Sequence, residues 1–135
     1  MEIKLDQKES EDLFYNALCN GAGLISGYGF ALDYSNEKYR EAKSSLLEKQ
    51  ESGDYSGMIC REDIWMEILR VGGTLTLVDE EGGGEYTSTV SIKEIWERVE
   101  KTPISHLSDM VNEQDDAVTA DVMLQTVFFK DVMFG

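Results

Sequence analysis

Residues 74–91 read TLTLVDEEGGGEYTSTVS, and this stretch decides the expected fold. Two runs rich in Thr, Val, Leu and Tyr flank an acidic turn that holds three glycines, a pattern typical of a β-hairpin. Helical patterns enclose the hairpin. Residues 60–73 predict a helix that ends at Gly72 and Gly73. After the hairpin, Ser91 and Glu94 form a capping box, which predicts a helix over residues 92–101.

Most of the remaining chain also has helical patterns. A first helix is expected over residues 7–20, because Asp6 and Glu9 have capping-box spacing and an apolar stripe follows them. The pair Asn20-Gly21 predicts its end, since glycine adopts the left-handed conformation without steric cost. Further helices are expected at residues 37–50, 103–111 and 117–129, with Ser35 or Asn36 capping the first and Asp116 or Thr119 capping the last.

Three short segments favour strands, namely residues 1–5, residues 30–34 and, as an edge strand, residues 130–135. By its length, the chain is expected to form a single domain over residues 1–135. The sequence therefore predicts an α+β fold, in which about five helices pack on a small, mostly antiparallel sheet with a hairpin at about 74–91. The inner face of the helix after Pro103 is expected to comprise Ile104, Leu107, Met110 and Val111.

The chain is strongly acidic. It has 27 Asp and Glu residues against 12 Lys and Arg, a net charge of −15. Such a molecule repels nucleic acids and anionic membranes and is steered toward basic protein surfaces, although the charge can also serve solubility alone. No apolar run approaches the ~20 residues that cross a membrane, and the N-terminus is too charged for a signal peptide. We therefore expect a cytoplasmic protein without direct contact to nucleic acid or membrane.

Two acidic groups are candidate partner-binding sites. Carboxylates at the hairpin turn resemble a row of phosphates that fits a basic groove on another protein, and two carboxylates before the last helix are expected to join the contact. The alternative is a solvated acidic turn and helix end. Asp109 and Glu113 stand four residues apart, a spacing that suits Mg²⁺ or Ca²⁺, but the loop pattern of a calcium site is missing and no metal is expected. The candidate partner-binding residues are Asp79, Glu80, Glu81, Glu85, Asp115 and Asp116.

Residues 19–29, CNGAGLISGYG, form a glycine-rich stretch. A dinucleotide fingerprint needs a strand before the glycines and a helix after them, and here the expected order is reversed; the P-loop signature is also missing. Two interpretations remain, a helix end with a bend or the wall of a ligand pocket. The candidate ligand-binding residues are Gly21, Gly23, Gly27, Tyr28, Gly29, Phe30 and Tyr34, and phosphate contacts would have to come from Arg40, Arg61, Arg70, Arg98 or Lys101.

The usual catalytic sets are missing. His106 is the only histidine, which excludes zinc sites built on several histidines, and we expect it to be half exposed on a helix. Cys19 and Cys60 are expected to be reduced thiols, at least one of them buried. We therefore expect a protein that is not an enzyme and needs no cofactor.

Three segments carry a resemblance to a known group of proteins. Residues 72–97, GGTLTLVDEEGGGEYTSTVSIKEIWE, and residues 120–135, ADVMLQTVFFKDVMFG, resemble small acidic proteins encoded in bacteriophage genomes. The glycine-rich run after the first helix, ALCNGAGLISGYG at 17–29, is similar to the same group. The resemblance implies a phage origin and assigns no active-site residue.

Together, these features favour a non-enzymatic phage accessory protein that binds and inhibits a host protein with a basic surface. Counter-defence factors of the anti-CRISPR or anti-restriction type are one such class. The alternative is a small-molecule binder that sequesters a nucleotide immune signal through the glycine-rich stretch. The sequence leaves the oligomeric state open, and a homo-oligomer is compatible with it.

Overall fold

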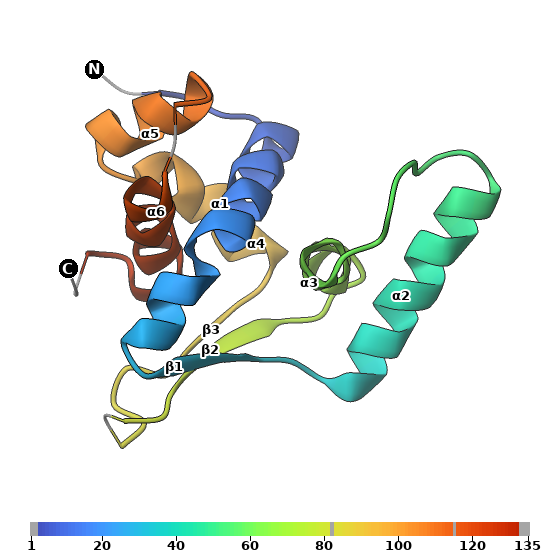
Figure 1. Ribbon diagram of the computed structural model, residues 1–135, viewed down its shortest axis with the longest axis horizontal. Coiled ribbons are helices and arrows are strands. Elements are labelled where there is room, and N and C mark those ends of the chain that lie inside the picture. The colour runs from blue at the N-terminus through green and yellow to red at the C-terminus, as the bar shows by residue number, and fades with distance from the viewer. Residues whose placement is uncertain (1–2, 82, 115, 133–135) are drawn as a thin grey trace.

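The computed structural model describes residues 3–81, 83–114 and 116–132, except for the side chains of residues 22–26. Within these residues the chain forms six α-helices and a three-stranded antiparallel sheet, which confirms the predicted α+β fold (Figure 1). In chain order the elements are α1 (Gln7–Gly27), β1 (Phe30–Asp33), α2 (Asn36–Glu51), α3 (Arg61–Arg70), β2 (Leu75–Asp79), β3 (Ser88–Val90), α4 (Ile92–Arg98), the 3-10 helix η1 (Val99–Lys101), α5 (Ile104–Val111) and α6 (Ala117–Phe129).

The sheet has the order β1-β2-β3, and its hairpin lies where the sequence predicts it. Phe30 pairs with Asp79 on one side of β2, and Leu75 pairs with Val90 on the other. Leu75 and Leu77 are buried beneath the helices. On the opposite face, the hydroxyl oxygens of Thr76 and Thr89 lie 2.8 Å apart in a hydrogen bond. One face of the sheet is therefore apolar and covered, as is common for antiparallel sheets.

Helix α6 is the centre of the molecule. Every residue from Thr119 to Phe128 is buried, so the helix is covered on all sides. Helix α1 lies alongside it, and α4, α5 and the sheet complete its surroundings (Figure 1). Phe14 of α1 and Phe128 of α6 pack with ring centroids 6.2 Å apart. The predicted helix over residues 117–129 is confirmed, and it lies at the centre of the fold.

The predicted end of the first helix is wrong. Helix α1 continues through Asn20-Gly21 to Gly27. Gly21 is buried against α6: a Cβ at this position would lie 3.0 Å from the Cβ of Ala120 and 3.0 Å from Cδ1 of Leu124. The glycine is therefore a point of close approach between two helices, and packing against α6 outweighs its low helix propensity.

Both chain ends also differ from the prediction. Residues 3–6 form no strand, and neither do residues 130–132; the rest of the expected edge strand lies outside the described residues. The capping box before α1 is confirmed, since the Glu9 N–H donates to Asp6 Oδ1 at 2.7 Å and the Asp6 N–H donates to Glu9 Oε1 at 3.1 Å. On α5, Ile104 and Val111 are exposed by 47% and 44%. The expectation that both residues lie on the inner face of this helix is therefore wrong.

Gly21→Val tests the close approach of α1 and α6. The added methyl groups have no free space beside Ala120 and Leu124, so we expect a loss of about 1–3 kcal/mol in the free energy of unfolding. Gly27→Ala is the matched control, because a Cβ at Gly27 meets no atom within 4 Å. Chemical denaturation of both variants measures the effect. Equal stability of Gly21→Val and Gly27→Ala would contradict the packing role.

Candidate partner-binding site and charge network

The turn between β2 and β3 presents three of the four predicted carboxylates to solvent. Glu80, Glu81 and Glu85 are exposed, whereas Asp79 is only 6% exposed. Asp79 Oδ2 accepts a hydrogen bond from the Tyr86 N–H at 3.2 Å. The Asp79 N–H in turn donates to Thr87 Oγ1 at 3.1 Å. Asp79 therefore stabilises the turn through hydrogen bonds to Tyr86 and Thr87. The exposed acidic residues of the turn are limited to the three glutamates.

Gly29 positions this turn against β1. Its φ of +86° is in the left-handed region, and its carbonyl accepts a hydrogen bond from the Glu80 N–H at 2.9 Å. The side chain of Glu81 lies directly over it, because a Cβ at Gly29 would meet Glu81 Cδ at 2.6 Å. The positive φ favours glycine here, whereas the flexible Glu81 side chain could move to make room for a Cβ.

The second predicted acidic group is only partly described. Asp116 is exposed and caps α6, where its Oδ1 accepts a hydrogen bond from the Thr119 N–H at 2.9 Å. This bond lowers the pKa of Asp116. Asp115 lies outside the described residues. Asp116 therefore has a structural role as a helix cap, whether or not a partner also contacts it.

The spacing of Asp109 and Glu113 does not place them on one helix face. Helix α5 ends at Val111, and Glu113 adopts a left-handed backbone with a φ of +59° in the following turn. Among the described residues, no group of three or more His, Cys, Asp and Glu side chains is arranged to hold a metal ion.

The aromatic residues of the glycine-rich stretch are engaged in internal contacts. Phe30 is buried, and its ring centroid lies 5.3 Å from that of Phe129. Tyr34 stacks on Tyr39 at 5.3 Å. Gly21 and Gly23 lie inside α1, Gly27 is its last residue and Gly29 is in the turn that follows. These residues are thus spread over a helix, a turn and a strand, which argues against the pocket wall that the sequence suggested.

Sequence reasoning missed a buried carboxylate next to this stretch. Asp121 on α6 is 5% exposed, and its Oδ2 accepts hydrogen bonds from Gln125 Nε2 at 3.0 Å and from the Tyr28 hydroxyl at 3.4 Å. Its other oxygen, Oδ1, has no hydrogen-bond partner in the described structure. Burial raises the pKa of Asp121, and the two hydrogen bonds offset only part of that effect. The sequence feature that could have indicated this buried carboxylate is the position of Asp121 as the single acidic residue in the apolar segment 117–129.

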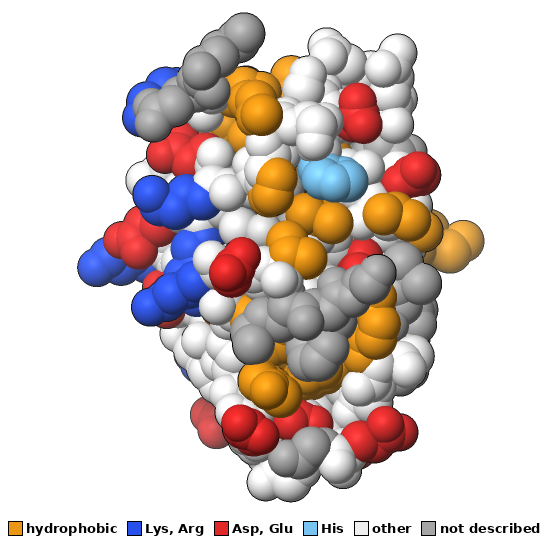
Figure 2. Space-filling view, turned by 90° about the vertical axis from the view of Figure 1, so that its left-hand side faces the viewer, with side chains coloured by type: hydrophobic (Ala, Val, Ile, Leu, Met, Phe, Trp, Pro, Cys, Tyr) orange, Lys and Arg blue, Asp and Glu red, His pale blue; other side chains and the backbone are white. Residues whose placement is uncertain are grey.

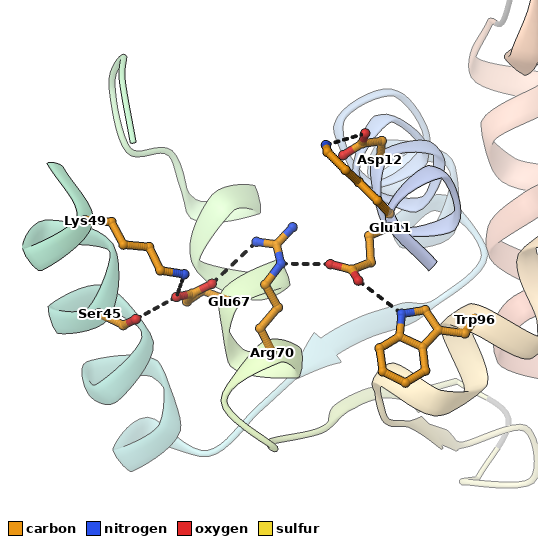
Figure 3. Close-up of polar contacts among 8 residues, drawn as sticks. Glu11, Asp12, Ser45, Lys49, Glu67, Arg70 and Trp96 are labelled. Atoms are coloured by element: carbon orange, nitrogen blue, oxygen red, sulfur yellow. Dashed lines mark hydrogen bonds and ion pairs between the residues drawn. The ribbon is translucent and has the colours of Figure 1, made fainter. Parts of the chain in front are cut away.

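Glu67 is the centre of a charge network that the sequence also did not reveal. It lies on the buried side of α3, and its carboxylate forms hydrogen bonds or ion pairs with three side chains (Figure 3). Ser45 Oγ and Lys49 Nζ, both on α2, lie 2.6 Å and 2.7 Å from Glu67 Oε2. Arg70 Nη1 lies 3.4 Å from Glu67 Oε1. The carboxylate therefore fastens α2 to α3, the helix on which α2 chiefly packs.

Arg70 extends the network to the helical body. Its Nε donates to Glu11 Oε1 on α1 at 2.8 Å, and Glu11 Oε2 accepts a hydrogen bond from Trp96 Nε1 on α4 at 3.1 Å (Figure 3). Burial alone would raise the pKa of Glu67, but hydrogen bonds from Lys49 and Ser45 and the charge of Arg70 outweigh it and lower that pKa. Glu67 thus stays ionised, and the network that it forms with Arg70 and Glu11 joins four helices.

The thiols and the histidine show no catalytic arrangement. Cys19 and Cys60 are both exposed, so the expectation of a buried cysteine is wrong. Partial burial of its sulfur raises the pKa of Cys19, which disfavours the nucleophilic thiolate. His106 is half exposed as predicted, and its Nδ1 lies 3.2 Å from the hydroxyl of Thr119.

The comparisons with known proteins give no assignment. No protein-family model matches the chain, and no curated protein or solved structure is significantly similar to it. In the part of the chain that the structure describes, no helix combines the length and apolarity of a membrane span.

Asp79→Ala tests whether Asp79 stabilises the turn while the exposed glutamates do not. Removing its carboxylate leaves the Tyr86 N–H without this acceptor, so we expect the variant to lose about 1–3 kcal/mol in stability. Glu80→Ala is the control, and its effect should stay within about 0.5 kcal/mol because the side chain is exposed. Thermal unfolding of both variants measures the difference. Similar losses of stability in the two variants would contradict the structural role of Asp79.

Glu67→Gln tests the charge network through pH. Because the folded-state pKa of Glu67 is lowered, its stabilisation is present above the unfolded pKa of about 4.3 and is lost as pH falls through the folded value. The stability gap between wild type and Glu67→Gln should therefore be largest near neutral pH and narrow in acid. Glu97→Gln is the control, since Glu97 forms only a surface pair with Lys93 at 3.8 Å. A difference in stability between wild type and Glu67→Gln that does not vary with pH would contradict the stabilising role of the ionised Glu67 carboxylate.

Proposed function

We propose that this protein is a non-enzymatic, acidic bacteriophage accessory protein that acts in the cytoplasm of the host bacterium. It binds and inhibits a host protein through that protein's basic surface, as a counter-defence factor of the anti-CRISPR or anti-restriction type. One observation carries the proposal: three exposed glutamates on the β2–β3 turn form no ion pair with the described residues, in a chain with a net charge of −15. The phage origin rests on the resemblance of residues 72–97 and 120–135.

The turn suits the recognition of a basic groove. Glu80, Glu81 and Glu85 form no ion pair or side-chain hydrogen bond with any described residue, so their charges are available to a partner. Asp79 and Gly29 hold the backbone beneath them. Figure 2 shows acidic side chains gathered at the end of the molecule where the β2–β3 turn lies. A group of exposed carboxylates accelerates association with a positive surface.

Exposed apolar side chains near the second acidic group complement the charge. Val111 and Val118 flank the turn between α5 and α6 and are exposed by 44% and 59%. The face in Figure 2 carries orange apolar side chains above the acidic end. Interfaces commonly combine an apolar centre with a polar rim, and this face offers both. The charges would guide the encounter, and the valines would contribute to the lifetime of the complex.

The test is affinity capture from bacterial host lysate with a salt-gradient elution. Wild type should retain one basic protein or complex that rising salt releases, because screening weakens charge-driven contacts. Glu80→Lys/Glu81→Lys/Glu85→Lys should lose that protein. The control is Glu41→Lys/Glu48→Lys/Glu51→Lys, which changes the net charge equally but on α2, far from the turn in Figure 1. The control should retain the partner.

The captured protein is then purified, and its association rate and activity are measured. The turn variant should associate more slowly and lose most of the salt dependence, and wild type should inhibit the partner's activity. Equal capture by the turn and control variants would exclude the turn as the contact. Capture without inhibition would reduce the proposal to a binding role.

A further inference from the structure

Cys19 and Cys60 are the only cysteines of the chain, and both are exposed. Cysteines without a disulfide are more often buried, because the thiol behaves as a small apolar group. Cys19 lies on α1 and Cys60 is the N-cap residue of α3, so the two come from separate elements. We propose that they are a redox-sensitive pair, in which a reversible disulfide joins α1 to the start of α3. The proposal does not rest on the proposed partner binding.

One stripe of side chains on α1 faces α3. Glu11, Tyr15 and Cys19 are spaced four residues apart and therefore share a face of the helix. At one end of this stripe, Glu11 Oε1 accepts the hydrogen bond from Arg70 Nε at 2.8 Å. In its middle, the Tyr15 hydroxyl interacts with the carboxylate of Asp63, in the first turn of α3. Cys19, the third member, therefore lies toward the start of α3.

Asp63 holds Cys60 at the same place. The Cys60 N–H donates to Asp63 Oδ2 at 2.8 Å, and the Tyr55 hydroxyl donates to Asp63 Oδ1. Asp63 thus contacts both Cys60 and Tyr15, and the Tyr15 hydroxyl in turn interacts with the thiol of Cys19. The two cysteines of the chain, which are far apart in sequence, therefore converge on one small group of polar side chains between α1 and α3.

The surroundings of Cys19 keep its thiol protonated near neutral pH. Burial raises the pKa of Cys19, and Glu62, Asp63 and Cys60 raise it further, whereas the hydrogen bond with Tyr15 offsets only part of this effect. The Cys19 thiolate therefore lacks the stabilisation that makes the disulfides of low-pKa cysteines strongly oxidising. We expect the disulfide to form slowly and, once formed, to resist reduction.

Hydrogen peroxide is an oxidant that balances the reaction. The thiolate of one cysteine attacks the O–O bond, which leaves a sulfenic acid on that sulfur and releases hydroxide, and the hydroxide takes up the proton that the thiol lost. The thiol of the other cysteine then attacks the same sulfur, so that the S–S bond forms and water leaves. Two thiols thus give up two protons and two electrons, and one peroxide becomes two waters. A dithiol reverses the reaction by thiol–disulfide exchange.

Oxidation of the native protein with hydrogen peroxide tests the pair. We expect the loss of both free thiols, a mass decrease of about 2 Da in the monomer and a peptide cross-link between Cys19 and Cys60. The reaction should be faster in mildly alkaline than in neutral buffer, and dithiothreitol should restore both thiols. The oxidised monomer should unfold at a higher temperature than the reduced protein, because the cross-link restricts the unfolded chain. Oxidation that yields only sulfinic acids or disulfide-linked dimers would overturn the proposal.

A variant with one relocated thiol is the matched control. Cys60→Ser/Ser44→Cys keeps the composition and moves the second thiol to an exposed position on α2, which lies beyond α3 from α1 in Figure 1. Serine is a favoured N-cap residue, so α3 should keep its start. We expect this variant to form an intramolecular disulfide at least about tenfold more slowly, since bridged cysteines need Cα atoms within about 7 Å. Equal rates in wild type and in the variant would refute the pair.

Discussion

The close packing of α1 against α6 is the contact on which the rest of the structure depends. Helix α6 is mostly apolar, and ten consecutive residues of it are buried, so it is covered around its whole circumference. Such a helix needs neighbours on every side, and α1 is the longest of them. Gly21 permits the near approach to Ala120, and Phe14 continues the contact with Phe128. The small sheet and the short helices α4 and α5 complete the cover, and their placement follows from this pair.

The elements that local chemistry specifies could be predicted from the sequence. The hairpin, the capping box at Ser91 and the cap at Asp116 depend on residues within a few positions of each other. The end of α1 could not be predicted, because Gly21 continues the helix only in contact with α6, about a hundred positions away in sequence. The same limit explains Glu67, whose partners Ser45 and Lys49 come from another helix.

The candidate site was predicted in part. Turn chemistry located the acidic tip, but it did not separate Asp79 from Glu80. The strand pattern contained that distinction: Leu75, Leu77 and Asp79 alternate on the covered face of β2, so the period of two assigns Asp79 to the buried side.

Buried and exposed carboxylates differ in how they are paired with cations, and this difference bears on why the surface is so negative. Inside, Glu67 is neutralised by two cations, whereas Asp121 has none and its pKa is raised. Outside, Glu80, Glu81 and Glu85 are exposed on one turn and form no ion pair with the described residues. The side chains of Arg98 and Lys130 line the same surface pocket as Glu85, without an ion pair to it. Like charges held together repel each other, so stability alone would favour their dispersal. Solubility requires net charge but no concentration of it at one tip, and this concentration is the observation on which the proposed binding of a basic partner rests.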